Sequence, residues 1–216
     1  MVWSRGRSEH FGDSRDDSRA SASTRRQLLG RSVVAGAALA GGGIVLGSRA
    51  RWAGAAPSRA QDVRIFNFAL LLEYLQAAFY GEAVRQGALR GEPREFAEVV
   101  AGHERAHVAY LRKALGGRAR ARPAFSFGDA TRSERRFLET AVLLENLGVA
   151  AYNGQAANLT TKALAAAAKI VSVEGRHAAW VSDLAGKEPA PRAADPGASA
   201  AAVVGSIRRT GFVGAS

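Results

Sequence analysis

Apolar residues recur at steps of three and four positions along four segments of the chain, and this spacing predicts four amphipathic helices. The segments cover about 63–86, 93–115, 132–153 and 162–185. A fifth, short and alanine-rich helix is predicted near 199–207, after a stretch that contains prolines. No segment shows sustained alternation of apolar and polar residues, so we expect an all-α fold without a β-sheet.

Capping residues and glycines predict where these helices begin and end. Asp62 and Thr161 are expected to cap the first and fourth helices, and Thr131 with Glu134 matches a capping box for the third. Glycines, which favour helix termination, follow three of the helices at Gly87, Gly116, Gly117 and Gly186.

The lengths of the connections predict the topology. The connections 87–92 and 154–160 are short, so the first two helices and the last two should form antiparallel hairpins. The connection 116–130 is longer, and a loop of that length reaches ~50 Å, whereas a helix of ~23 residues is ~35 Å long. It can cross the whole bundle, with Phe125 and Phe127 as anchors on the helices. We therefore predict a four-helix bundle of two hairpins with one long crossover.

Each apolar stripe is interrupted near its middle by residues that are costly to bury. These residues are Glu73, Glu104, His107, Glu145, Glu174 and His177. An unpaired buried carboxylate costs several kcal/mol, and the inward faces carry no arginine that would offset this cost. Two divalent metal ions would balance the net charge of −4 from four carboxylates and two neutral imidazoles. Glu-x-x-His suits such a site because side chains three positions apart on a helix point the same way.

The two hairpins also resemble each other in sequence. Leu-Glu-Tyr-Leu at 72–75 aligns with Leu-Glu-Asn-Leu at 144–147, and a tyrosine follows each glutamate by seven positions, at Tyr80 and Tyr152. A Glu-x-x-His motif follows in each half, at 104–107 and 174–177. We interpret this as an internal duplication, which implies a pseudo-two-fold axis between the hairpins.

Other polar residues near these motifs receive lesser roles. Tyr80 and Tyr152 are expected to be core residues with hydrogen-bonded hydroxyls rather than redox participants, and Asp183 is a weaker candidate for supporting a ligand. His103 lies one step off the stripe and is expected at the surface or its boundary rather than as a ligand.

Composition and charge narrow the possible functions. The chain of 216 residues has no cysteine, which excludes disulfides, iron–sulfur clusters and thiol catalysis. The net charge is +11, but nearly half of the excess lies in the first 55 residues. No basic helix with interleaved aromatic residues is present in the sequence, so we do not expect nucleic acid as a partner.

The first 55 residues are typical of a disordered extension followed by an export signal. Arg25 and Arg26 precede an uncharged run of alanine, valine and glycine, and Ala53 and Ala55 form a small-x-small cleavage site. We expect export through the twin-arginine translocase to the periplasm, cell envelope or exterior, with membrane attachment only if the leader is uncleaved. A short linker at 56–61, the bundle at 62–186 and a tail with its short helix at 187–216 would follow.

The residues of the bundle resemble the ferritin-like superfamily, and within it an exported bacterial group sometimes called desiccation-related. The resemblance rests on Asn-Phe-Ala-Leu at 67–70, Phe-Gly-Asp-Ala at 127–130, Gly-Val-Ala-Ala-Tyr-Asn-Gly at 148–154 and the motif 174–180. It implies a carboxylate and histidine site for two metal ions, with iron favoured over manganese.

The resemblance implies three reactions: oxidation of ferrous iron, reductant-dependent peroxide reduction and peroxide disproportionation. We rank the first and third highest, because a chain without cysteine cannot hold the iron–thiolate domain that would deliver electrons. The expected role is protection from stress. A non-catalytic helical protein that protects other molecules during desiccation is the alternative, and assembly into a homo-oligomer is possible.

Overall fold

Five α-helices make up most of the computed structural model, which describes residues 56–213. Their bounds are α2 (Arg59–Gln86), α3 (Gly91–Leu115), α4 (Glu134–Gln155), α5 (Thr161–Leu184) and α6 (Ala200–Thr210). The only β-pairing within 56–213 is an isolated bridge between Phe125 and Val213. The prediction of an all-α fold with a short C-terminal helix is therefore confirmed. The predictions for the first 55 residues concern a part of the chain that the structure does not describe.

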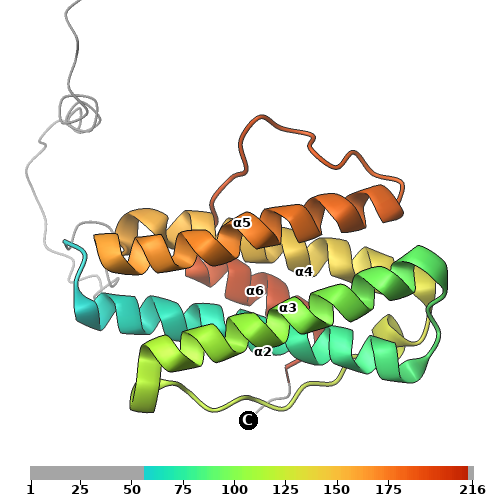
Figure 1. Cartoon of the computed structure of the whole chain (residues 1–216), viewed down its shortest axis with the longest axis horizontal. Helices are drawn as coiled ribbons and strands as arrows, with labels where there is room; N and C mark the ends of the chain where they lie inside the picture. The colour runs from blue at the N-terminus through green and yellow to red at the C-terminus, as the bar shows by residue number, and fades with distance from the viewer. Residues whose placement is uncertain (1–55, 214–216) are drawn as a thin grey trace, which may run out of the picture. The chain divides into compact units, whose positions relative to one another are not determined.

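Two helical hairpins lie side by side and form the bundle (Figure 1). Helices α2 and α3 pack against each other, as do α4 and α5, and the hairpins meet through α2 with α4 and α3 with α5. The segment 116–133 runs along the bundle from the end of α3 to the start of α4 (Figure 1). Because it spans the bundle, α3 and α4 run in the same direction, as the one-crossover topology requires.

The crossover is held by aromatic packing and by the end of the tail. The Phe127 ring is buried, with its centroid 5.5 Å from that of Phe79 and 5.2 Å from that of Phe212. The backbone N–H of Ser126 donates to the carbonyl of Phe212 at 3.0 Å. Phe125 is partly buried against the core. Both phenylalanines therefore anchor the crossover, as the sequence predicts.

The N-terminal caps differ from those predicted for the first and last bundle helices. Ser58 caps α2, so this helix begins four residues earlier than expected, and Thr160 rather than Thr161 caps α5. Asp62 instead accepts hydrogen bonds from the backbone N–H of Thr160 at 3.0 Å and from its hydroxyl at 2.7 Å. Asp62 therefore does not cap its own helix but joins the N-terminus of α2 to that of α5, in the other hairpin.

The predicted capping box at the start of α4 is wrong. Thr131 lies in a 3₁₀ turn before the helix, and its hydroxyl donates to Glu82 at 2.7 Å. Glu134 accepts from the backbone N–H of Arg90 at 3.3 Å, and Ser133 is the residue that precedes the helix. Both side chains bond to residues of the first hairpin and therefore do not form the capping box.

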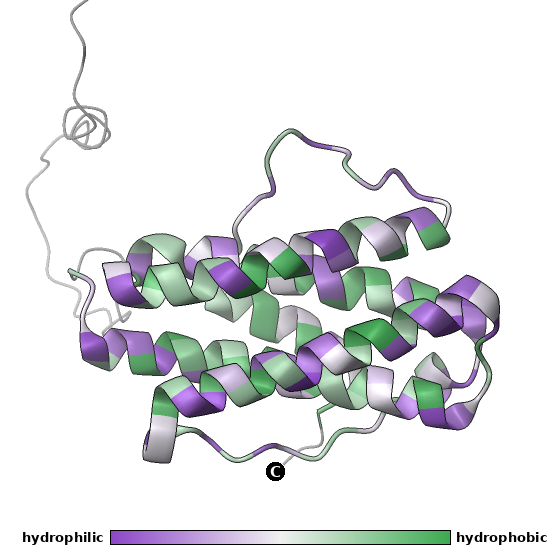
Figure 2. Ribbon diagram, viewed as in Figure 1, coloured by the Kyte–Doolittle hydropathy of each residue, from purple (hydrophilic) through white to green (hydrophobic). Residues whose placement is uncertain are grey.

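The apolar interior is divided into two clusters. One contains Phe79, Phe96 and Phe137, and the other contains Leu70 and Leu111. Figure 2 shows hydrophobic residues in green alternating with polar residues in purple along every bundle helix. The division follows from the interrupted stripes, because the glutamates and histidines occupy the inward positions between the two clusters.

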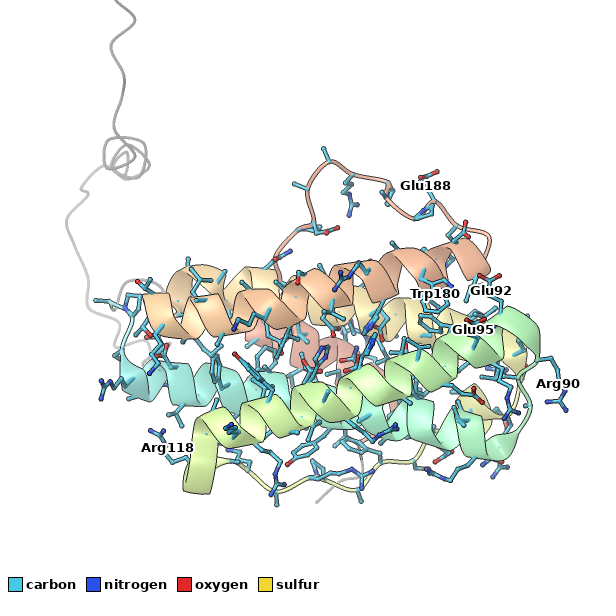
Figure 3. The ribbon with its side chains drawn as sticks, viewed as in Figure 1. Arg90, Glu92, Glu95, Arg118, Trp180 and Glu188 are labelled. Carbon is cyan, nitrogen blue, oxygen red and sulfur yellow. The ribbon has the colours of Figure 1, made fainter. Side chains whose placement is uncertain are left out.

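Trp180, near the end of α5, is partly buried and packs against the cluster that contains Phe96. Figure 3 shows Trp180 of α5 next to Glu92 at the start of α3. The indole N–H donates to the Glu92 carboxylate at 3.4 Å, and the indole packs edge-on against the Phe96 ring at 5.1 Å. This contact ties the start of α3 to the last turns of α5. No helix within residues 56–213 has the length and apolar character to span a membrane.

Candidate metal centre

The four bundle helices bring six polar side chains together at the centre of the bundle. Helices α2 and α4 each contribute one glutamate, and α3 and α5 each contribute a glutamate and a histidine one turn later. The exposed fractions are Glu73 1%, Glu104 0%, His107 8%, Glu145 0%, Glu174 0% and His177 3%. The six residues singled out in the sequence therefore share one buried site, although their role as metal ligands remains a prediction.

The six side chains form two overlapping groups of four. Around His107, the Nδ1 atom lies 3.2 Å from Glu73 Oε2, 3.2 Å from Glu174 Oε1 and 3.5 Å from Glu104 Oε2. Around His177, the Nδ1 atom lies 3.2 Å from Glu145 Oε2, 3.3 Å from Glu104 Oε1 and 3.8 Å from Glu174 Oε1. Within each group the four potential ligand atoms lie within 4.8 Å of one another.

Glu104 and Glu174 belong to both groups, whereas Glu73 and Glu145 each belong to one. Glu104 turns one oxygen toward each histidine. Glu174 turns the same oxygen, Oε1, toward both histidines. These two glutamates therefore face both histidines, whereas Glu73 faces only His107 and Glu145 faces only His177.

Two tyrosines cross between the hairpins to hold the terminal glutamates, Glu73 and Glu145. Tyr80 of the first hairpin donates to Glu145 Oε1 at 2.5 Å, and Tyr152 of the second donates to Glu73 Oε1 at 2.6 Å. Burial, and then the neighbouring Glu145 or Glu73 carboxylate, raises the pKa of each tyrosine well above its usual value. Each hydroxyl therefore keeps its proton and remains a donor. The internal repeat relates these two hydrogen bonds, because each joins the tyrosine of one hairpin to the terminal glutamate of the other.

Two residues without a predicted role in the site also contact the cluster. Gln76 is buried, and its amide donates to Glu145 Oε1 at 3.0 Å and to Glu174 Oε2 at 3.3 Å. Its position three residues after Glu73, on the same face of α2, is a signal that the sequence does contain. His103 is exposed as expected, yet its Nδ1 lies 2.9 Å from His177 Nε2. That contact joins α3 to α5, so local spacing gives no sign of it.

Asp183 does not support a ligand, contrary to expectation. It lies exposed in the last turn of α5. Nine residues separate it from Glu174, which is two and a half helical turns, so the two side chains leave the helix on opposite faces.

Several ligand atoms in the cluster have no hydrogen-bond partner. These buried atoms are Glu104 Oε1, Glu104 Oε2, Glu145 Oε2, Glu174 Oε1 and His177 Nδ1. Buried polar atoms are almost always hydrogen-bonded, and the exceptions call for an explanation. Carboxylate oxygens and an imidazole nitrogen that converge in this way fit a bound divalent metal ion.

Without metal, two glutamates of the cluster keep their protons to a higher pH than a free carboxyl group does. Burial, together with the charge of Glu104, raises the pKa of Glu73 to about 8. Burial, with the charges of Glu73 and Glu145, raises the pKa of Glu174 to about 8 as well. Both shifts arise because buried carboxylates lie close together. Protonation removes this unfavourable negative charge when no cation is bound.

The pKa values of the two histidines are raised as well, because the negative charge around them stabilises their protonated form. Burial alone would lower the pKa of each imidazole, but contacts with the surrounding carboxylates outweigh it. The result is a pKa of about 12 for His107 and about 10 for His177. A metal ion must therefore displace protons from the histidines before it can bind at Nδ1.

The sequence from residue 61 to 187 matches the family described as the ferritin-like domain. The matched region covers more than half of the chain and includes the four bundle helices except for the first two residues of α2. The chain belongs to the ferritin-like family. No curated protein matches the sequence. The ferritin-like domain of this chain thus carries a buried group of glutamates and histidines that can hold metal ions.

We expect the metal-free ferritin-like domain to lose stability as the pH rises from about 5 to 9. Glu73 and Glu174 are protonated in the folded state up to a pKa of about 8 but ionise near 4.5 when unfolded. The histidines keep their protons in the folded state above their unfolded pKa of 6.5. All four groups bind more protons when folded, so the free energy of unfolding falls with rising pH.

Each unit of pKa shift corresponds to about 1.4 kcal/mol, and we expect the melting temperature to fall by roughly 10 °C over this range. Thermal unfolding followed by circular dichroism of chelator-treated protein measures it. The variant Glu73→Gln should show a smaller fall, and Glu139→Gln, a change at an exposed residue, should match the wild type. A melting temperature that rises with pH would contradict the assignment.

Proposed function

We propose that this ferritin-like protein is exported and holds two divalent metal ions, with iron favoured over manganese, to oxidise ferrous iron or remove peroxide. The single observation that carries the proposal is the pair of overlapping ligand groups that share Glu104 and Glu174. Two divalent ions would balance four carboxylates if both imidazoles are neutral. Spacing of ~3.5–4 Å between two ions is typical of such centres.

The residues of the chain have distinct roles in this proposal. Glu73 and His107 would hold one ion, Glu145 and His177 the other, and the two shared glutamates would contact both. Bound iron or manganese supplies the change of oxidation state that these reactions need. The tyrosines keep the terminal carboxylates oriented, and the apolar clusters on either side of the centre exclude water from it.

The choice of reaction follows from the supply of electrons. In disproportionation one peroxide molecule is oxidised to dioxygen and a second is reduced to water, so no external reductant is consumed. In ferrous oxidation the iron itself supplies the electrons, and peroxide or dioxygen accepts them and is reduced to water. Both reactions suit a chain without cysteine, which has no thiolate-bound iron of its own for electron delivery.

Export is supported by the leader rather than by the folded domain. Arg25 and Arg26 stand before an uncharged run, and Ala53 and Ala55 mark a cleavage site. Because the twin-arginine translocase carries folded proteins, the centre could be loaded with metal before export. A role in stress protection outside the cytoplasm is consistent with this route.

We expect the purified protein to bind about two equivalents of iron or manganese per chain, as measured by elemental analysis after reconstitution. Glu104→Gln removes a charged ligand from both groups and should reduce the content to one equivalent or less. Glu98→Gln changes an exposed glutamate of the same helix, paired with Arg94, and should leave the content unchanged. A reconstituted wild type without metal would favour the non-catalytic protective protein.

We expect the metal-loaded protein to consume peroxide without an added reductant. The protein is loaded separately with iron and with manganese, and peroxide alone is then added. Evolution of dioxygen in an oxygen electrode identifies disproportionation. In a separate assay with excess ferrous iron and peroxide, rapid and repeated loss of ferrous iron identifies iron oxidation. Turnover that starts only when an electron donor is supplied would contradict the ranking.

We expect the double variant Arg25→Lys, Arg26→Lys to accumulate in the cytoplasm as an uncleaved precursor. The twin arginines are the part of the leader that the translocase recognises. Cell fractionation and N-terminal sequencing measure the result, and the exported wild type should begin at residue 56. Arg5→Lys with Arg7→Lys is the matched control, and normal export of the Arg25, Arg26 variant would rule out this route.

A further inference from the structure

The internal repeat is broken at two positions around the centre. The repeat pairs Gln76 with Gly148, three residues after the terminal glutamates, and His103 with Val173, one residue before the Glu-x-x-His motifs. Gln76 and His103 both contact members of the His177 group. Their counterparts, a glycine and a valine, have no polar side-chain atom to offer the His107 group.

Gln76 orients two ligands of the His177 group. Its amide holds Glu145 by Oε1 and the shared Glu174 by Oε2. This leaves Glu145 Oε2 directed toward His177 and Glu174 Oε1 directed toward both histidines. No equivalent side chain fits in the other half, because a Cβ atom at Gly148 would lie 2.6 Å from Glu174 Oε2. The glycine thus makes room for the shared glutamate, and of the two terminal glutamates only Glu145, in the His177 group, receives an amide hydrogen bond.

His103 orients the histidine of the same group. Its ring lies nearly parallel to that of His177, at an interplanar angle of 13° with centroids 5.1 Å apart, and its Nδ1 lies 2.9 Å from His177 Nε2. If His177 binds a metal ion through Nδ1, its remaining proton is on Nε2 and can be donated to His103. Such a partner fixes the tautomer and the ring of a metal-binding histidine, and its loss typically weakens metal binding by ~10–100-fold.

The ligand atoms of the two groups are not equally ready to bind. The shared glutamates present unpartnered oxygens to both groups, at Glu104 Oε1, Glu104 Oε2 and Glu174 Oε1, so the difference lies in the other two residues of each group. In the His177 group, Glu145 Oε2 and His177 Nδ1 have no hydrogen-bond partner. In the other group His107 Nδ1 is hydrogen-bonded to Glu73 Oε2 at 3.2 Å, and this contact must break before a metal ion can bind. The side chain of His107 is also 11% exposed, against 3% for His177.

We propose that the two metal positions are inequivalent: the position at His177 fills first and retains its ion, and the position at His107 fills second and exchanges its ion with solvent. His103 is a positioning residue for the first ion. This inference rests on the proposed two-metal function and adds an order of filling to it. The exchangeable ion would then be the one that meets iron or peroxide from outside.

Calorimetric titration of the metal-free full-length chain with Zn²⁺ tests the proposal, because zinc suits the same ligands and undergoes no redox change. We expect two binding steps of different affinity. Two variants related by the repeat assign the steps: Glu145→Gln should abolish the tight step, and Glu73→Gln should abolish only the weak one. Two equal steps, or the opposite assignment, would overturn the proposal.

The role of His103 is tested in the same titration. His103→Val, which copies the residue of the other half, should weaken the tight step by ~10–100-fold and leave the weak step unchanged. His103→Asn retains an acceptor and should restore most of the affinity, whereas the matched control Val173→Ala should alter neither step. Equal weakening of both steps by His103→Val would refute the positioning role. Absence of any zinc binding by the wild type would instead refute the two-metal function itself.

Discussion

The mutual repulsion of four buried carboxylates is the constraint on which the rest of this structure depends. In a marginally stable domain such a cluster persists only if cations or protons compensate it. The raised pKa values of Glu73 and Glu174 record how the metal-free protein meets this need with protons. The division of the apolar core into two clusters follows as well, since the polar centre occupies the layer between them.

The topology supplies what a single hairpin cannot. Each hairpin carries a terminal glutamate and the tyrosine that follows it by seven residues, but the tyrosine bonds the glutamate of the other hairpin. The hydrogen bonds that orient the ligands are therefore also contacts between the hairpins. The crossover makes this exchange possible because it sets α2 beside α4 in opposite directions.

Most of the fold and the six central residues could be predicted from the sequence, because helical periodicity and a repeated Glu-x-x-His motif are local signals. The failures share a physical cause. Asp62, Thr131 and Glu134 have the chemistry of helix caps, yet each bonds a partner from the other hairpin, which local pattern does not reveal. The contact of His103 with His177 is equally non-local. The prediction for Asp183 failed for the opposite reason, because its spacing from Glu174 along the helix is a local signal that already places it on the outer face of α5.

The pairing of the tail with the crossover has a consequence for how the chain is made. Phe212 and Val213 follow all five helices in the sequence, yet they fasten Ser126 and Phe125 in the middle of the chain. During synthesis the contacts of Ser126 and Phe125 with the tail therefore cannot form until these late residues have left the ribosome, whereas Phe127 can already pack on Phe79. For a protein proposed to cross a membrane only after folding, these contacts would be among the last to form before export.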